Sequence, residues 1–341
     1  MLETTWFVLW GILWAFYFML DGFDLGIGSL LPFIAKNETD KRTIYKSVGP
    51  FWDGNEVWLI TAGGVTFAAF PATYAVMFSS LYTPLMLILF ALILRGAALE
   101  LRGKTTSPAG RSLWDFCFVI GSFLPALLFG VAFANIFKGI PIDGEGILQG
   151  NLLTLLNPYG ILGGLLFLSL FLVHGSLWLA AKSEGEVYLR AGSTVRALWP
   201  ILIVIAVLFL IYTAFQTSVY ENYLSSPLLF IIPALCVCAL FLIRIYAGQK
   251  SYWKAWLASC IAIVCATLFG VVGIYPNLFP SSLDAKYSMT IYNSASSPLS
   301  LKIMLVVALI FVPIVIIYQG WAYTLFKGKV KEEEGGEGEA Y

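Results

Sequence analysis

The stretch "KSVGPFWDGNEVWLITAGGVTFAAFP", residues 46–71, places two acids at the mouth of an apolar run. Asp53 and Glu56 are three residues apart, and residues 58–70 contain no charged side chain. Apolar runs recur along the whole chain. With 59% hydrophobic residues, 12% charged residues and a mean hydropathy of +0.84, the 341-residue chain is too apolar for a soluble domain. We therefore predict an integral membrane protein.

Working outward from this stretch, we predict nine transmembrane helices. An α-helix needs about 20 apolar residues to cross a hydrocarbon core about 30 Å thick, and it satisfies its own backbone hydrogen bonds there. A transmembrane β-barrel would instead show alternating segments of about 10 residues. The predicted spans are residues 5–34, 54–70, 73–94, 114–135, 158–181, 197–215, 227–247, 255–275 and 302–326.

The basic residues alternate from loop to loop. Of the 20 Lys and Arg, only Lys138, Lys286 and Lys302 lie on the side opposite to all the others. The positive-inside rule then places the N-terminus outside and the C-terminus in the cytoplasm. Residues 1–326 are predicted to form a single polytopic membrane domain. Residues 327–341 are acidic and Gly-rich, which predicts a disordered cytoplasmic tail.

The segment between the first two spans, "NETDKRTIYKSVGP", has a helical pattern of its own. Ile44 and Val48 are four residues apart and have basic residues beside them. This pattern predicts a short helix that lies on the anionic inner surface of the membrane.

Two more acids lie inside the first span. Asp21 and Asp24, in "LDGFDLGIG", share one helix face at a spacing of three residues. Carboxylates inside a membrane are costly and normally face a bundle interior or a water-filled path. Gly22 and Gly26 would let another helix or a bound group approach closely. In the alternative interpretation, the helix breaks at Gly22, and the two acids only bring water to the backbone at the break.

Asp53 and Glu56 also admit two interpretations. After a proline, D-x-x-E is typical of a helix start, with Asp53 as the N-cap and Glu56 at the third helical position. In the other interpretation, both carboxyl groups exchange protons at the cytoplasmic side, where Trp52 and Trp58 flank them.

Other polar residues in the spans are weaker candidates. Glu100 lies between Arg95 and Arg102, which predicts mutual neutralisation. His174 is the only histidine, and hydrogen bonding to a neighbour is expected for it rather than metal ligation. One histidine cannot supply paired axial ligands to several haems, and the five cysteines show no metal-ligand spacing. Acting alone, the chain is not expected to be a redox enzyme.

Five segments resemble subunit II of the cytochrome bd quinol oxidases. They are "LDGFDLGIG", "GPFWDGNEVWLITAGGVTFAAFPATYA", "GSFLPALLFGVAFAN", "LLNPYGILGG" and "YPNLFPSS". The similarity extends over essentially the whole chain, and the block around "WDGN" is long enough to be highly specific. Two positions depart from the pattern, because Glu56 stands where some members have Gln and His174 occupies a position that need not be His.

The resemblance implies an all-α membrane protein with nine transmembrane helices, arranged as two four-helix bundles plus one peripheral helix. It implies a heterodimer with subunit I, which holds haem b, haem d and the quinol site, whereas this chain binds no haem or metal. Small single-helix subunits accompany some members, and a structural quinone or lipid can be present. Such a complex oxidises quinol and reduces dioxygen to water in the bacterial cytoplasmic membrane, with protons taken from the cytoplasm.

Within this family, Asp53 and Trp52 are expected to line the cytoplasmic mouth of a proton path at the boundary with subunit I. Asp21 and Asp24 would lie along or beside it, and Glu56 would extend its acidic lining. A proton-coupled secondary transporter is the alternative, although the chain shows no second acidic break near residue 200. A third interpretation is a structural membrane partner whose acids are only helix caps.

Overall fold

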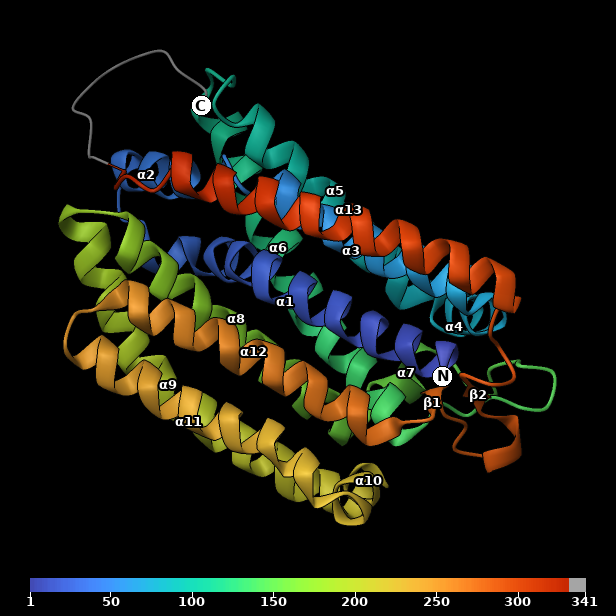
Figure 1. Ribbon diagram of the computed structural model, residues 1–341. Helices are drawn as coiled ribbons and strands as arrows, with labels where there is room; N and C mark the ends of the chain where they lie inside the picture. The colour runs from blue at the N-terminus through green and yellow to red at the C-terminus, as the bar shows by residue number, and fades with distance from the viewer. Residues whose placement is uncertain (331–341) are drawn as a thin grey trace.

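A computed structural model describes residues 1–330, and these residues are mostly helical (Figure 1). The helices are α1 (Leu2–Ile34), α2 (Glu38–Val48), α3 (Trp52–Ala69), α4 (Pro71–Ser80), α5 (Tyr82–Leu101), α6 (Pro108–Lys138), α7 (Leu152–Leu155), α8 (Pro158–Lys182), α9 (Gly185–Gln216), α10 (Val219–Ser225), α11 (Ile231–Gly248), α12 (Tyr252–Ile274) and α13 (Pro298–Leu325). Short 3₁₀ helices cover Pro227–Phe230 and Ala285–Tyr287, and two strands, β1 (Asn277–Phe279) and β2 (Met289–Thr290), form a small antiparallel sheet. The acidic part of the predicted tail, residues 331–341, lies outside the described residues.

Eight helices in residues 1–330 are long and apolar enough to cross a membrane, and they correspond to eight of the nine predicted spans. The remaining span, residues 54–70, corresponds to α3. This helix is less apolar than the other eight because Asp53, Asn55 and Glu56 lie in its first turns. The predicted count of nine is therefore confirmed for eight helices only.

The predicted span 73–94 is not a single helix. The chain leaves helical geometry at Leu81, between α4 and α5. Pro84 lies just beyond this point. Proline has no N–H to donate to the carbonyl of Ser80, and its ring displaces that carbonyl. The membrane-spanning helix is therefore α5, and α4 is a separate short helix.

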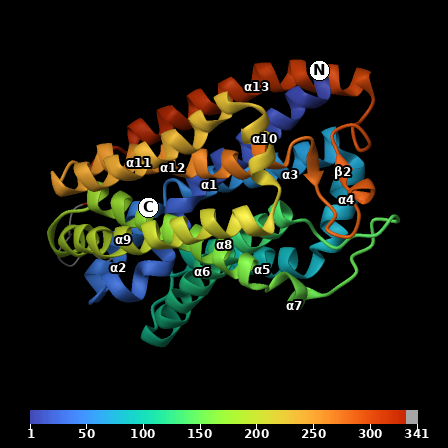
Figure 2. The ribbon, with the colours of Figure 1, turned by 90° about the horizontal axis from the view of Figure 1, so that it is seen from below.

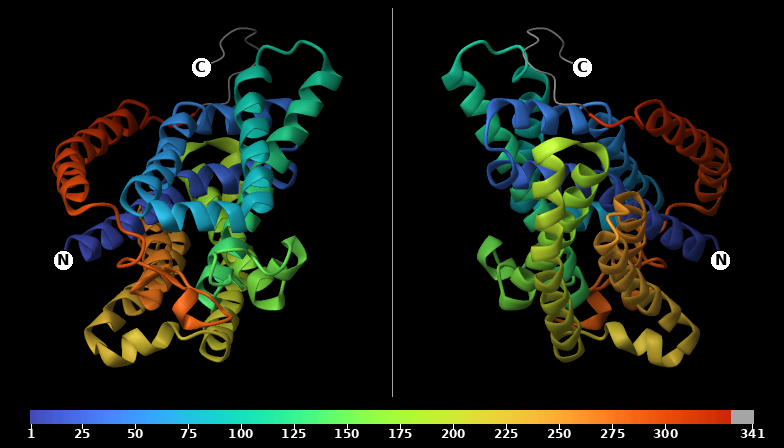
Figure 3. Two further views of the ribbon diagram at one scale, coloured as in Figure 1. Left: turned by 90° about the vertical axis from the view of Figure 1, so that its right-hand side faces the viewer. Right: turned by 90° about the vertical axis from the view of Figure 1, so that its left-hand side faces the viewer.

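The long helix α1 lies at the centre of the assembly. It packs against α3 and α6 on one side and against α8 and α12 on the other. The helices α5, α9 and α11 pack against α6, α8 and α12, respectively. Two groups of four result, one with α1, α3, α5 and α6 and the other with α8, α9, α11 and α12. Helix α13 contacts mainly α1 and α3 and lies at one edge (Figures 2 and 3), as predicted for a peripheral helix.

Glycine brings α1 and α8 into close contact. A Cβ added at Gly26 would overlap the backbone carbonyl of Phe171, and a Cβ at Gly175 would lie 2.7 Å from the backbone nitrogen of Ile27. The close approach expected at Gly22 and Gly26 is thus made by another helix, α8. Because α1 is continuous through Gly22, the alternative of a helix break there is wrong.

Helix α2 lies at the end of the bundle that carries most of the basic residues, on the left in Figure 1. We call this end, with α2 and the connections 102–107, 183–184 and 249–251, the basic end. A capping box of Asn37 and Asp40 starts α2. Ile44 and Val48 are fully buried against the protein. The predicted helix is present, and its apolar face covers the bundle. Its contact with the membrane surface stays a prediction.

Candidate functional site

A buried ion-pair group joins α1, α3 and α5. Arg95 Nη2 donates to Asp21 Oδ1 at 2.7 Å and to Glu56 Oε1 at 2.5 Å. The side chains of Arg95 and Asp21 are fully buried, and that of Glu56 is 24% exposed. Charges so far from water are stable only when they are paired and hydrogen-bonded. The group therefore ties three helices together inside the membrane protein.

The position of Arg95 differs from the sequence-based expectation. The predicted span 73–94 ends just before Arg95, and the sequence predicts that Glu100 neutralises it; both expectations are wrong. Arg95 lies within α5, where it faces Asp21. Glu100 instead lies 3.7 Å from Lys104, and its side chain is 46% exposed. The signal in the sequence was a cation at the end of an apolar run, but nothing local identified its partner 74 residues away.

A second polar group connects α1, α3 and α13. Asn55 Nδ2 donates to Asp24 Oδ2 at 2.7 Å. Asn55 Oδ1 accepts from Gln319 Nε2 at 3.0 Å and from the Tyr323 hydroxyl at 2.8 Å. Trp58 Nε1 donates to Gln319 Oε1 at 2.6 Å. These contacts hold the peripheral helix α13 beside α3. No local pattern in the sequence identifies Asn55, Gln319 or Tyr323 as partners.

Several buried polar atoms in this region have no hydrogen-bond partner within residues 1–330. They are Asp21 Oδ2, Asp24 Oδ1, Arg95 Nε and Nη1, and the hydroxyl of Tyr17. Buried polar atoms in proteins are normally paired with other protein groups or with ordered water. The region around the two acids of α1 is thus suited to hold additional hydrogen-bonding groups.

Asp53 lies exposed on the first turn of α3. The N-cap of this helix is Phe51, which makes no side-chain capping bond. Asp53 is therefore not the N-cap, and Glu56 is engaged in the ion pair, so the capping interpretation is wrong. The Trp52 ring packs on α5, because a Cβ added at Gly96 would lie 3.2 Å from Trp52 Cζ3.

The structure brings some of the predicted site residues together and leaves others apart. Asp21 and Glu56 meet at Arg95, whereas Asp24 is held separately by Asn55. Asp53 makes no hydrogen bond or ion pair within residues 1–330 that would join it to either group. The acids nevertheless form a graded series along α3 and α1, from exposed Asp53 through partly exposed Glu56 to fully buried Asp21.

His174 is hydrogen-bonded to its neighbours, as expected. Its Nδ1 lies 2.5 Å from the Ser259 hydroxyl, and its Nε2 lies 2.9 Å from the carbonyl oxygen of Met19. The ring stacks on Trp256 at an interplanar angle of 9°. In the part of the chain that the structure describes, no group of three or more His, Cys, Asp or Glu is placed to hold a metal ion.

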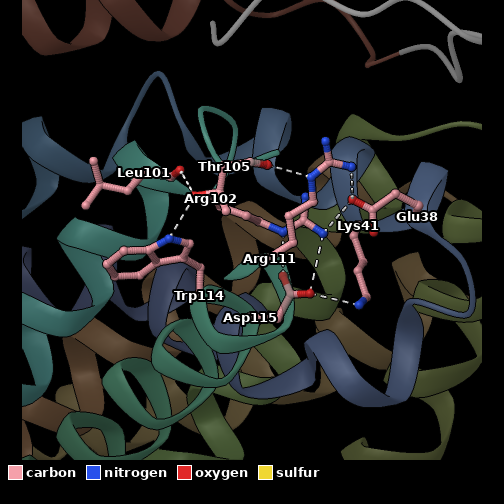
Figure 4. A network of polar contacts seen from close by, with 8 residues as sticks. All are labelled: Glu38, Lys41, Leu101, Arg102, Thr105, Arg111, Trp114 and Asp115. Atoms are coloured by element: carbon pink, nitrogen blue, oxygen red, sulfur yellow. Dashed lines mark hydrogen bonds and ion pairs between the residues drawn. The ribbon is translucent and has the colours of Figure 1, made fainter. Parts of the chain in front are cut away.

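Charged residues at the basic end fasten α2 to the α5–α6 hairpin (Figure 4). Arg102 Nε donates to Asp115 Oδ1 at 2.5 Å, and Arg102 Nη2 donates to Glu38 Oε1 at 2.9 Å. Lys41 Nζ donates to Asp115 Oδ2 at 2.8 Å. Arg111 Nη1 lies 3.8 Å from Glu38 Oε1. These pairs are closed among themselves, which indicates a structural role for this cluster.

Comparison with known proteins identifies the family. The family described as "Cytochrome bd terminal oxidase subunit II" matches residues 2–326. The chain belongs to this family. Cytochrome bd-I ubiquinol oxidase subunit 2 of Escherichia coli strain K12 is 32% identical to it, covering 98% of this chain and 96% of the relative. Cytochrome bd ubiquinol oxidase subunit 2 of Bacillus subtilis strain 168 is 33% identical, covering 98% of both chains.

The fold of this subunit II is also similar to a solved structure. The bd oxidase from Geobacillus thermodenitrificans matches with a TM-score of 0.77, covering 95% of this chain and 98% of that chain at 18% sequence identity. The family predicted from the sequence motifs is thus confirmed. As a cytochrome bd subunit II, the chain is a multi-pass membrane component of a terminal oxidase complex, and the transporter alternative is set aside.

Proposed function

We propose that this subunit II pairs with a haem-bearing subunit I in the bacterial cytoplasmic membrane and helps to deliver cytoplasmic protons for the reduction of dioxygen by quinol. The names of the Escherichia coli and Bacillus subtilis relatives support a quinol as the electron donor of the complex. The observation that carries the proton-delivery role is the series Asp53, Glu56 and Asp21, in which exposure falls from the basic end into the bundle.

The charge balance of the buried acids supports this role. Asp21, Asp24 and Glu56 are three carboxyl groups, and within residues 1–330 Arg95 is the cation that contacts two of them. One guanidinium neutralises one carboxylate, so a proton taken up by another carboxylate removes a costly buried charge. The orphaned oxygens of Asp21 and Asp24 offer positions where such a proton can be bound or passed on.

The one histidine of this chain does not fit a haem ligand, which supports an assignment of haem b and haem d to subunit I. Haem iron takes axial ligands such as His, Met or Cys. Both ring nitrogens of His174 are engaged, one with Ser259 and one with the carbonyl of Met19. Its ring is also fully buried against Trp256. No step of the proposal therefore uses a haem bound to this chain.

The exposed face of α3 is the proposed contact with subunit I. Val57, Ile60 and Phe67 on this face are 44%, 74% and 60% exposed. A Cβ added at Gly64 meets no other atom within 4 Å, so a partner helix can approach closely there. Asp53 lies exposed at the start of the same helix, and a carboxylate is better accommodated against a protein partner than against lipid. This contact would place Asp53 at the subunit boundary.

Three single substitutions in the two-subunit complex test the proposal. Glu100→Gln is the control, because Glu100 is a partly exposed acid at the same end whose ion pair is with Lys104. We expect Asp53→Asn to lower quinol-driven oxygen consumption by about tenfold or more with an unchanged haem spectrum, since a proton-transferring group has been removed. Glu56→Gln should have a smaller effect, since some family members have Gln there.

Two results would contradict the proposal. Unchanged turnover in Asp53→Asn would show that the acid does not carry protons and that the subunit is mainly a scaffold. Purification of the chain without any haem-bearing partner would refute the pairing with subunit I.

A further inference from the structure

We propose that Asn55 is a positioning residue for proton delivery, because a one-way chain of hydrogen bonds makes its side-chain amide donate to Asp24. The chain runs from Trp58 on α3 to Gln319 on α13 and back to Asn55 on α3. It leaves one oxygen of Asp24, Oδ1, as the position where this acid exchanges protons. This role of Asn55 rests on the proposed proton-delivery function and adds to it the atom that carries the proton.

Trp58 fixes the first link of the chain. An indole N–H can only donate a hydrogen bond. Trp58 Nε1 lies 2.6 Å from the Gln319 side chain, so the Gln319 atom that faces it is the carbonyl oxygen Oε1. The other side of the same amide is therefore Nε2. A second neighbour agrees, because the carbonyl oxygen of Gly54 can only accept and lies 3.3 Å from Gln319 Nε2.

Gln319 in turn fixes the orientation of Asn55. Its Nε2 can only donate, and it lies 3.0 Å from the Asn55 side chain. The Asn55 atom that faces it is therefore Oδ1, and Nδ2 points to Asp24 Oδ2 at 2.7 Å. The Tyr323 hydroxyl also contacts Asn55 Oδ1, at 2.8 Å. A hydroxyl can donate or accept, so Tyr323 alone would not set the direction of the chain.

The two oxygens of Asp24 consequently differ. The side chains of Asp24 and Asn55 are both fully buried. Asp24 Oδ2 accepts from Asn55, whereas Oδ1 has no hydrogen-bond partner within residues 1–330. A proton on Oδ2 would point at the N–H group of Asn55 and would be repelled. A proton therefore binds at Oδ1, and Oδ2 stays the carbonyl oxygen that accepts from Asn55.

Infrared spectroscopy of the purified two-subunit complex tests the chain without turnover. The protonated Asp24 carboxyl is identified at low pH as the C=O band that disappears in Asp24→Asn. Gln319→Met replaces the side chain by one of similar size without an amide, so Asn55 can adopt either orientation. A hydrogen bond to a carbonyl oxygen lowers its stretching frequency. We therefore expect the Asp24 band to shift to higher frequency in Gln319→Met.

Trp6→Phe is the matched control. Trp6 Nε1 on α1 donates to the carbonyl of Leu301 on α13 at 3.1 Å, so this variant also removes a hydrogen bond that holds α13. It leaves the chain from Trp58 to Asp24 intact, and the Asp24 band should not move.

Proton uptake during an oxygen pulse gives the functional readout, with the haem spectrum recorded as a check on assembly. We expect Gln319→Met to slow uptake by about tenfold, the effect of losing one hydrogen bond to a charged group. Trp6→Phe should take up protons at the wild-type rate.

Several results would overturn this role of Asn55. They are an unshifted Asp24 band in Gln319→Met, the absence of such a band in the wild type, and an equal shift in Trp6→Phe. Wild-type uptake in Gln319→Met would also overturn it when Asp53→Asn slows uptake. If Asp53→Asn does not slow uptake, the proposed function itself fails, and the infrared band still decides whether Asn55 orients Asp24.

Discussion

Replacement of Arg95 by leucine is expected to destabilise the subunit strongly. Arg95 is fully buried, and its Nη2 contacts both Asp21 and Glu56. Removal of the guanidinium leaves two carboxylates unpaired, one of them without access to water. Breaking a buried pair by removing one partner costs about 3–5 kcal/mol. At about 2 °C per kcal/mol for a large chain, the melting temperature should fall by about 6–10 °C.

A double-mutant cycle separates lost pairing from general damage to packing. Asp21→Asn removes the fully buried carboxylate, while Arg95 keeps its contact with Glu56. The double variant Asp21→Asn/Arg95→Leu should therefore lose about 1–3 kcal/mol less than the sum of the two single variants.

The assay is thermal unfolding of the purified complex, followed by intrinsic fluorescence at one fixed scan rate. The scan rate must be fixed because membrane complexes often unfold irreversibly. Strictly additive shifts would refute the conclusion that Asp21 and Arg95 stabilise each other. An Arg95→Leu variant as stable as the wild type would refute the burial argument itself.

Three further substitutions test other parts of the structure. His174→Ala removes two buried hydrogen bonds and should lower the unfolding free energy by about 3 kcal/mol while the haem spectrum is retained, as measured by thermal unfolding and absorbance. Gly26→Ala should disrupt the α1–α8 contact and reduce the yield of folded complex in size-exclusion chromatography. The control Gly248→Ala should not, because a Cβ at this position meets no other atom within 4 Å. Equal yields of the two variants would contradict the close α1–α8 packing. The backbone N–H of Ile147 donates to the Asp143 carboxylate and lowers its pKa. This hydrogen bond therefore stabilises the turn at neutral pH, and the stabilisation is lost as the pH falls below about 4. Below about pH 4, amide exchange in residues 143–149 of the wild type should accelerate relative to exchange in Asp143→Asn, whose side chain does not titrate. An equal change in both proteins would contradict this.

The helices were predictable because the membrane requires them. An apolar run of about 20 residues has few alternatives to a helix, so eight predicted spans were confirmed. The break at Leu81 was missed although its cause is visible in the sequence. Pro84 removes one hydrogen-bond donor just inside an otherwise continuous apolar run. The apolar face of α2 packs on the bundle, and this was not predictable because spacing alone does not distinguish a protein neighbour from a lipid neighbour.

The site was only partly predictable for a related reason. The cost of intramembrane charge selected Asp21, Asp24 and Glu56 without knowledge of the fold. The partners Arg95 and Asn55 were not selected, because each meets its acid across a helix contact that no local pattern encodes. Pairing between distant helices depends on how they pack together, and this information came only from the structure.

The most direct test of the central claim is the rate of proton uptake by the complex during a single oxygen pulse. The reduced complex, with wild-type Asp53, Asp53→Asn or Glu100→Gln, is mixed with oxygen in the presence of a pH indicator, and the haem spectrum is recorded in the same experiment. We predict that Asp53→Asn slows proton uptake by about tenfold or more while haem oxidation begins normally, and that Glu100→Gln behaves as the wild type. Proton uptake at the wild-type rate in Asp53→Asn would contradict the proposal that this subunit delivers protons through its acidic series.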